Sequence, residues 1–507
     1  MIKINGNKLS LNQIIQVSQK NERVSLDDVA LERIITSRRA LEKIIKKGNP
    51  VYGINTGFGT FANCKISIKD TELLNHNLII SHAVGFGEPL SKAIVRAAML
   101  IRANTLAKGF SGVRANLIQT ILDMLNKGVT PIVKSQGSLG SSGDLCMLAQ
   151  LALVICKNQE DKDDESGMAE YEGIVLTGKE AMRKARISRI QLMAKEGLAI
   201  INGATFSTAI AALTIVKGIF AIDVATHASA LTLESMLGKS EPFDPRVQNV
   251  RGLFGQKVIA SNILKFVAGS SFINSGQQVQ DPYSLRCVPQ IHGAIMDTFE
   301  YVRGIIEKEV NAATDNPLIF DSDVISGGNF HGEPIALGMD FLAIALTELG
   351  AVSERRIFQL TDANLNNGLP HMLVGISAAT GLNSGMMIPQ YTAASLVLEN
   401  RTLSFPDSVQ SLPTSANQED HNANAMTAAR HALLILENTL YILSIELFVA
   451  GRALQIRMLQ NPDKVLGKIN KKIFAKIKNL IPNNAEDRLW GKEIDLLHEK
   501  LVNGDVI

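Results

Sequence analysis

The segment Gly137–Gln150, which reads GSLGSSGDLCMLAQ, is the part of the chain best suited to unusual chemistry. Three glycines and three serines fall within its first seven residues, and an apolar run follows at once. This pattern predicts a tight loop that leads into a helix, with Asp144 capping that helix or lying in its first turn. Most Gly/Ser clusters are only turns and caps of this kind.

A second reading concerns Ser141-Ser142-Gly143. If the chain bends sharply there, the Gly143 nitrogen can approach the Ser141 carbonyl carbon, because glycine permits backbone conformations that other residues resist. Attack and loss of water close a five-membered ring, and loss of a second water from Ser142 leaves an exocyclic methylene. The product is an electrophile, which no ordinary side chain provides. Ser141 gives the ring only its backbone, so we expect its hydroxyl to be a spectator.

Other polar side chains interrupt apolar segments. Asn202 lies within AIINGATFSTA, where a buried amide must find a hydrogen-bonding partner. Tyr283 and Arg286 are three residues apart in QDPYSLRCVPQ, so a helical turn places them on one face, and an arginine can hold a carboxylate with two hydrogen bonds. Ser415–His421, SANQEDH, gathers an amide, two acids and an imidazole. The ordinary alternatives are a helix–helix hydrogen bond, a structural salt bridge and a solvated loop.

Taken together, these segments resemble the aromatic amino acid ammonia-lyase family. Residues 137–145 are similar to its signature GS-[LV]-G-x-SGDL, in which Ala-Ser-Gly forms a methylidene-imidazolone (MIO) group, and Ser141 replaces the Ala here. Residues 280–286 are similar to Q-D-x-Y-S-[LI]-R, and residues 52–59 to Y-G-x-N-T-G-F-G. The likeness covers essentially the whole chain. It implies an MIO group formed from Ser141-Ser142-Gly143, with no external cofactor and no metal.

The resemblance also implies roles for single residues. Tyr52 would be a catalytic acid/base, and because an ordinary tyrosine has a pKa of about 10, we expect cations or N–H groups to lower the pKa of Tyr52. Arg286 would hold the substrate carboxylate. The remaining residues implied near the substrate or the MIO ring are Asn202, Gln280, Tyr283 and Phe330.

Two pairs point to a substrate. Ser81-His82 and Gln418-Glu419 resemble the pairs found in histidine-directed members, in which the glutamate accepts the imidazole N–H. An unpaired buried donor would otherwise cost about 1–3 kcal/mol. The resemblance therefore implies elimination of ammonia from L-histidine to give trans-urocanate. The alternative within the family is an ammonia-lyase or aminomutase acting on tyrosine or phenylalanine. On an apolar segment alone, His82 would be an ordinary core histidine.

Composition narrows the class of protein. The chain has 507 residues, of which 46% are hydrophobic and 20% charged, so it can bury a large core. The net charge of +2 argues against a nucleic-acid partner. The first residues lack a signal-peptide pattern, so we expect a cytoplasmic protein. The cysteines, at positions 64, 146, 156 and 287, lack disulfide-framework or zinc-site spacing and are expected to be reduced thiols.

Two further segments have plain interpretations. Gly197–Val216 is uncharged for twenty residues, but its polar side chains and the lack of flanking anchors favour a helix buried on all sides in a large bundle over a membrane span. Lys157–Gly173 contains EDKDDES, and its lack of periodicity predicts a solvated loop with no assigned function.

The elements that must position these residues are mainly helical. From about Ile187 onward, long apolar segments alternate with polar joints, and strand-like alternation is scarce. We expect a mainly α fold in three parts: an N-terminal globular region, 1–186, with the MIO loop and the tyrosine loop, a central long-helix bundle, 187–460, and a C-terminal helical extension, 461–507. The resemblance implies a homotetramer with shared active sites that acts on a small-molecule amino acid.

Two other functions compete with a lyase. A serine hydrolase could use Ser142 with His421 or His82, but its context G-S-S-G differs from the G-x-S-x-G of a nucleophile elbow. A non-catalytic helical scaffold would have no reason to concentrate tyrosine, arginine, asparagine and glutamate at its polar joints.

Overall fold

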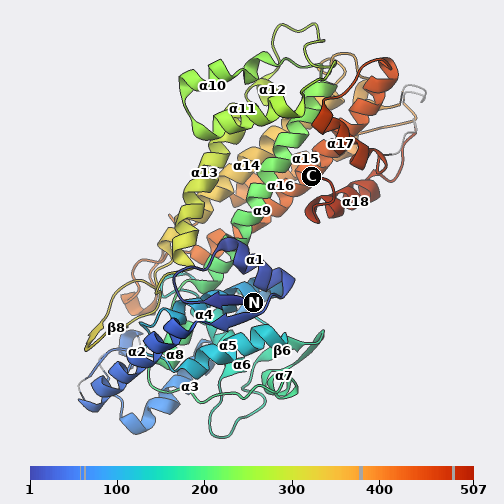
Figure 1. Ribbon diagram of the computed structural model, residues 1–507. Helices are drawn as coiled ribbons and strands as arrows, with labels where there is room; N and C mark the ends of the chain where they lie inside the picture. Colours follow the sequence, from blue (N-terminus) through green and yellow to red (C-terminus); the bar gives the residue numbers. More distant parts are fainter. Residues whose placement is uncertain (49, 58, 62–63, 376–380, 482–485) are drawn as a thin grey trace. The chain divides into compact units, whose positions relative to one another are not determined.

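The computed structural model describes residues 1–507 except 49, 58, 62–63, 376–380 and 482–485 (Figure 1). The described residues form eighteen α-helices and nine short strands, so the predicted mainly α fold is confirmed. Contacts group the chain into two units. The first contains Met1–Val216, Val302–Asp340 and Pro406–Arg430, and the second contains Lys217–Tyr301, Phe341–Phe405 and His431–Ile507. Each unit therefore joins segments that are far apart in the chain, whereas the three expected parts follow chain order.

The first unit contains most of the short elements. Its strands make small sheets: β1 (Ile2–Ile4) with β2 (Val24–Leu26), β3 (Phe86–Pro89) with β5 (Lys134–Gln136), β4 (Thr130–Pro131) with β6 (Met168–Tyr171) and β7 (Ile174–Thr177), and β8 (Leu318–Phe320) with β9 (Asp323–Ile325). Its helices are α1 (Leu11–Lys20), α2 (Asp28–Lys46), α3 (Thr71–His82), α4 (Lys92–Ala107), α5 (Ala115–Lys127), α6 (Leu145–Ile155), α7 (Gly178–Lys184) and α8 (Glu196–Ile201). Helix α4 is buried over almost its whole length, as expected of a helix at the centre of a core.

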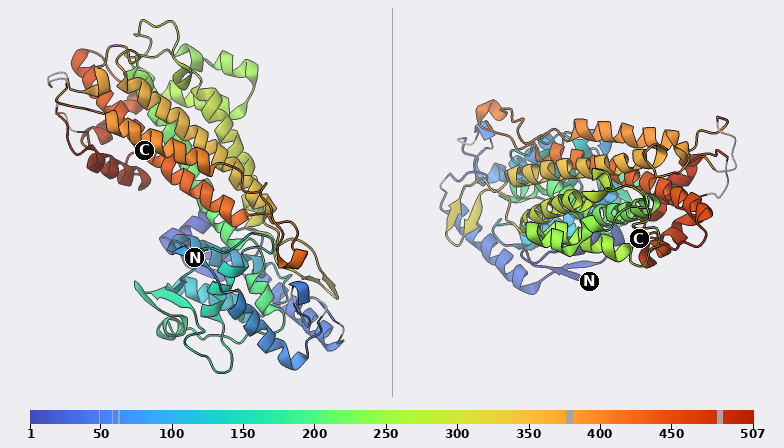
Figure 2. Two further views of the ribbon diagram at one scale, coloured as in Figure 1. Left: turned by 180° about the vertical axis from the view of Figure 1, so that it is seen from behind. Right: turned by 90° about the horizontal axis from the view of Figure 1, so that it is seen from above.

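The remaining helices of the described residues follow in the chain, and several of them are long (Figure 2). They are α9 (Thr205–Ser235), α10 (Pro245–Arg251), α11 (Phe254–Phe266), α12 (Tyr283–Arg286), α13 (Val288–Glu309), α14 (Glu333–Thr361), α15 (Met387–Leu403), α16 (Ala425–Gln460), α17 (Lys468–Lys478) and α18 (Trp490–Val502). In the second unit, Glu446 links its own helix, α16, to α9 and α14. Its carboxylate accepts hydrogen bonds from Thr232 of α9, at 2.9 Å, and from Ser353 and Arg356 of α14, both at 2.6 Å. The side chains of Arg356 and Glu446 are fully buried, so each satisfies a charge that would be costly alone.

The apolar segment 197–216 is not one helix, contrary to expectation. Helix α8 ends at Ile201, Asn202 follows it in extended conformation, and α9 begins at Thr205. The break exists because Gly203 adopts a φ of +124°, which side chains other than glycine's rarely allow. By length and composition, α9, α14 and α16 are apolar enough to cross a membrane, yet 72% of each apolar window is buried within the protein.

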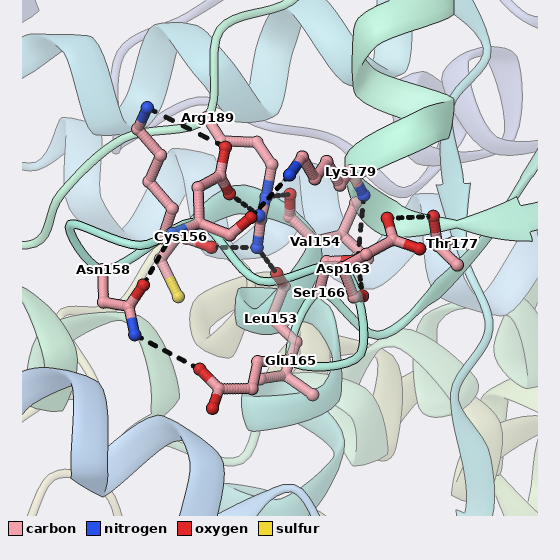
Figure 3. Close-up of polar contacts among 12 residues, drawn as sticks. Leu153, Val154, Cys156, Asn158, Asp163, Glu165, Ser166, Thr177, Lys179 and Arg189 are labelled. Atoms are coloured by element: carbon pink, nitrogen blue, oxygen red, sulfur yellow. Dashed lines mark hydrogen bonds and ion pairs between the residues drawn. The ribbon is translucent and has the colours of Figure 1, made fainter.

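The acidic run in residues 157–166 is not simply a solvated loop, because a buried arginine organises it (Figure 3). Arg189 donates to the carbonyl oxygens of Leu153, Val154 and Cys156, and its guanidinium also pairs with the Asp161 carboxylate. Its side chain is only 5% exposed. The loop is therefore tied to the end of α6.

Candidate active site

A cavity of about 1100 Å³ lies within the first unit. The residues predicted for the site that line it are Tyr52, His82, Ser141, Ser142, Asn202, Phe330, Gln418 and Glu419. They come from the loop after α2, from α3, from the loop before α6, from the break between α8 and α9, and from the loops before α14 and α16. Segments that are hundreds of residues apart in sequence thus meet around one cavity.

The loop at 141–144 is held against the break between α8 and α9. The Ser142 carbonyl oxygen accepts hydrogen bonds from the Asn202 side-chain nitrogen at 2.8 Å and from the Gly203 backbone nitrogen at 3.2 Å. The Asp144 backbone nitrogen donates to the Gly203 carbonyl oxygen at 2.9 Å. Gly143 has a φ of +77°, and an added Cβ would lie 2.0 Å from the Gly203 carbonyl carbon. Only glycine can occupy position 143 in this arrangement.

Asp144 occupies the N-cap position of α6, as predicted, but its side chain does not cap that helix. No side-chain cap bond forms at the start of α6. Instead, one carboxylate oxygen of Asp144 accepts from the backbone nitrogen of Ser207 at 2.8 Å, in the first turn of α9, and the other accepts from the Ser138 hydroxyl at 2.9 Å. Burial raises the pKa of Asp144. The carboxylate fastens the loop to α9, because free backbone N–H groups at a helix start attract an anion.

Arg102 supports the same break and was missed by the sequence analysis. Its guanidinium donates to the carbonyl oxygens of Asn202, at 2.8 Å, and Ala199, at 3.2 Å, and to the Thr205 hydroxyl. It therefore satisfies carbonyl groups that the end of α8 leaves free. Burial lowers its pKa to about 10, so it remains charged at neutral pH. An arginine inside the otherwise apolar α4 was the available signal.

Glu419 receives three hydroxyl groups. Ser142 Oγ donates to Glu419 Oε1 at 2.7 Å, and Ser141 Oγ and Thr414 Oγ1 donate to Oε2 at 2.8 and 3.1 Å. The Ser141 hydroxyl, which was expected to be a spectator in the chemistry of the ring, therefore has a specific acceptor. Thr414 and Glu419 also pair through their backbones, across a turn in which residues 415–417 all have positive φ. Such strained turns occur where a side chain must be aimed.

The environment of Tyr52 differs from the expected one. Burial raises the pKa of Tyr52 above its ordinary value of 10.0, and the nearby Glu419 charge raises it further, although a backbone hydrogen bond from Gly59 opposes the shift. This shift of the Tyr52 pKa is opposite in direction to the predicted one. The phenol is instead removed from water and lies near an anion, both of which disfavour the phenolate.

Histidines form part of the cavity wall. Burial lowers the pKa of His82, so its imidazole is neutral at pH 7, and its Nδ1 lies 3.0 Å from the Ser81 hydroxyl. His331 was not singled out from the sequence. Its Nε2 lies 3.1 Å from the His421 carbonyl oxygen, and its Nδ1 accepts from the Glu333 backbone nitrogen at 3.4 Å. These partners fit a hydrogen on Nε2 that points to the His421 carbonyl oxygen.

Three predicted residues, Gln280, Tyr283 and Arg286, belong to the second unit. The Arg286 guanidinium lies 4.7 Å from the Tyr283 ring centroid, which confirms that the two side chains share a face. Tyr283 is 70% exposed. Among the described residues, Arg286 has no ion-pair partner, and its Nε is buried without a hydrogen bond. Its guanidinium thus contacts the Tyr283 ring and no acidic side chain among the described residues.

Comparisons with known proteins identify relatives of the whole chain. The family model for aromatic amino acid lyase matches residues 9–479. A histidine ammonia-lyase of Caldanaerobacter subterraneus is 47% identical over 96% of this chain and 93% of its own. The crystal structure of histidine ammonia-lyase from Trypanosoma cruzi, 35% identical, matches with a TM-score of 0.90 over 100% of this chain and 94% of that one. A phenylalanine aminomutase from Pantoea agglomerans, 30% identical, matches with a TM-score of 0.93 over 100% of both chains.

Proposed function

Because the chain belongs to the aromatic amino acid lyase family, we propose that it eliminates ammonia from L-histidine to give trans-urocanate. The observation that carries this proposal is the position of Glu419. Its carboxylate contacts both serines of the 141–143 segment, so an acceptor for an imidazole N–H lies beside the segment expected to carry the electrophile.

The residues present fit an MIO group, on which this family depends. Gly143 has the φ of +77° that brings its backbone close to Gly203, and the Ser142 carbonyl oxygen already has two N–H donors. The Asn202 side-chain oxygen is buried without a partner among the described residues. The MIO group, formed from Ser141-Ser142-Gly143, would supply an electrophilic carbon for the substrate.

The residues of this chain would do the remaining work. The N–H groups of Asn202 and Gly203 would stabilise negative charge on the Ser142 carbonyl oxygen. Arg286, supported by Tyr283 and Gln280, would hold the substrate carboxylate with two hydrogen bonds. Tyr52, as phenolate, would take the β-proton of the amino acid. The phenolate is the reactive form of Tyr52. Because the pKa of Tyr52 is raised, the phenolate becomes abundant only at high pH.

Selectivity for an imidazole would come from Glu419 and its neighbours in the cavity. Glu419 would accept the ring N–H, because an unpaired buried donor costs about 1–3 kcal/mol. His82, Gln418 and Phe330 also line the cavity and would complete the contacts around the substrate ring. A phenylalanine ring carries no hydrogen-bond donor for the Glu419 carboxylate, and a tyrosine ring offers a phenol O–H in place of the ring N–H.

The proposed oligomeric state follows from the family resemblance. We propose a cytoplasmic homotetramer in which residues from different subunits share each active site. Gln280, Tyr283 and Arg286 would then act in a site completed by another copy of the chain.

Initial rates on L-histidine, L-tyrosine and L-phenylalanine test the function. We expect histidine to be strongly preferred, and Glu419→Ala to reduce turnover of histidine by about tenfold to a hundredfold because the imidazole donor loses its partner. A preference for tyrosine or phenylalanine would replace the proposal with the alternative, a lyase or aminomutase for those substrates. Near-wild-type turnover in Glu419→Ala would remove Glu419 from its role.

A further inference from the structure

The two oxygens of the Glu419 carboxylate have different partners. Among the described residues, Oε1 accepts only the Ser142 hydroxyl, at 2.7 Å. Oε2 accepts two hydroxyls, from Ser141 at 2.8 Å and from Thr414 at 3.1 Å. Hydrogen bonds to an ionised carboxylate are about twice as strong as those between neutral groups, so these hydroxyls fix the direction of the carboxylate.

Ring formation would change only one of these contacts. When Ser142 loses water, its Cα–H and Cβ–O bonds break, a Cα=Cβ bond forms, and its hydroxyl leaves. Oε1 of Glu419 then loses its only hydroxyl donor, whereas Oε2 keeps both of its donors. The carboxylate would be held by one oxygen, and the other would be free to accept a hydrogen bond from a ligand in the cavity.

We infer that Ser141 is a positioning residue that sets selectivity for an imidazole through Glu419. This inference rests on the function proposed above. With Thr414, the Ser141 hydroxyl holds Oε2 so that the freed Oε1 keeps its place for the ring N–H of the substrate. The side chain at position 141 thus acts on recognition of the substrate ring, while its backbone serves the electrophile.

The turn that carries Glu419 explains why a second hydroxyl is useful. Residues 415–417 hold a strained conformation, with φ values of +50°, +51° and +65°. Glu419 is joined to this turn by its backbone pairing with Thr414, and both of these residues belong to the same loop. Ser141 is the contact to Oε2 that comes from outside that loop, so it fixes the carboxylate relative to the 141–143 segment.

Ligand binding to the full-length enzyme separates this role from catalysis. Imidazolepropionate and phenylpropionate lack the amine, so calorimetry can measure their affinity without turnover. We expect Ser141→Ala to weaken imidazolepropionate by about tenfold, the effect of one charge-assisted hydrogen bond, and to change phenylpropionate by less than about twofold. Ser141→Thr, which keeps the hydroxyl, is expected to restore the imidazole preference.

Two further measurements complete the test. In a Glu419→Ala background, Ser141→Ala is expected to have no additional effect, because its hydroxyl acts through that carboxylate. The mass of the peptide that contains residues 141–143 is expected to show the same loss of two waters in Ser141→Ala as in the wild type. If Ser141→Ala does not fold, Thr414→Val removes the other donor to Oε2 and carries the same expectation.

Several outcomes would overturn the inference. They are equal weakening of both ligands, which would indicate a general structural role, an unchanged imidazole affinity in Ser141→Ala, and loss of ring formation in that variant. Failure of the proposed function looks different, because the wild-type enzyme itself would then neither deaminate L-histidine nor prefer imidazolepropionate.

Discussion

The Asn202 side-chain nitrogen donates a hydrogen bond to the Ser142 carbonyl oxygen at 2.8 Å, and the neighbouring Gly203 backbone nitrogen donates to the same oxygen at 3.2 Å. Two N–H groups that converge on one oxygen stabilise negative charge there without having to move during a reaction. Asn202 can do this because α8 ends at Ile201 and the chain turns at Gly203.

Asn202→Ala is expected to lower kcat/KM for L-histidine by about 10²–10³-fold, since one of the two donors is lost. Steady-state kinetics measures this, and the mass of the peptide containing residues 141–143 shows whether ring formation is also affected. Kinetics indistinguishable from the wild type would mean that the Asn202 contact does not contribute to the reaction.

The rate is expected to rise with pH until the Tyr52 phenol is ionised. Burial and the Glu419 charge raise the pKa of Tyr52 above 10.0, so at neutral pH only a small fraction is phenolate. Glu419→Gln removes one cause of this shift, so the rising limb of kcat/KM against pH is expected to move to lower pH. Tyr52→Phe is expected to lower the rate by about 10²–10⁴-fold. The rising limb of its pH profile is expected to disappear. An unchanged limb in Tyr52→Phe would assign the base to another residue.

Gly143→Ala is expected to prevent the 141–143 segment from reaching its conformation, because the new Cβ would lie 2.0 Å from the Gly203 carbonyl carbon. Gly128→Ala is a matched control. Gly128 has a φ of +79°, similar to the +77° of Gly143, but an added Cβ there meets no atom within 4 Å. We expect Gly128→Ala to cost about 1–2 kcal/mol and keep activity, whereas Gly143→Ala loses both ring formation and activity. Equal behaviour of the two variants would show that backbone strain, and not the contact with Gly203, decides the effect.

Arg189→Ala is expected to lower the free energy of unfolding by about 3 kcal/mol, because the Asp161 carboxylate and several carbonyl groups lose their partner. Arg183→Ala serves as the control, since Arg183 is an exposed arginine paired with Glu180 on α7, and its removal is expected to leave the melting temperature nearly unchanged. Thermal unfolding measures both variants. A similar melting temperature for Arg189→Ala and the wild type would show that Arg189 does not stabilise the 157–166 loop.

Local features of the site could be predicted from the sequence. The three-residue spacing of Tyr283 and Arg286 gave their shared face, and the polar residue inside an apolar segment marked Asn202 as a buried amide that needs a partner. Each of these depends on residues that are close together in the chain.

Contacts over long sequence distances could not be predicted in the same way. Ser141 and Glu419 are 278 positions apart, so nothing near Ser141 indicates that its hydroxyl has an acceptor. Asp144 precedes one helix but caps another, because the first turn of α9 brings its free N–H groups to the buried carboxylate. The raised pKa of Tyr52 has the same origin, since it depends on burial and on a carboxylate from a distant loop.

The central claim is that the backbone of residues 141–143 closes into an electrophilic ring. The mass of the intact, purified protein tests it most directly, together with the mass of the peptide that contains these residues. We expect the protein to be lighter than its amino-acid sequence by two water molecules, both lost from that peptide. Ser142→Ala has no Ser142 hydroxyl, so we expect that variant not to lose the second water. A wild-type protein that deaminates L-histidine while its 141–143 peptide retains both waters would contradict the account.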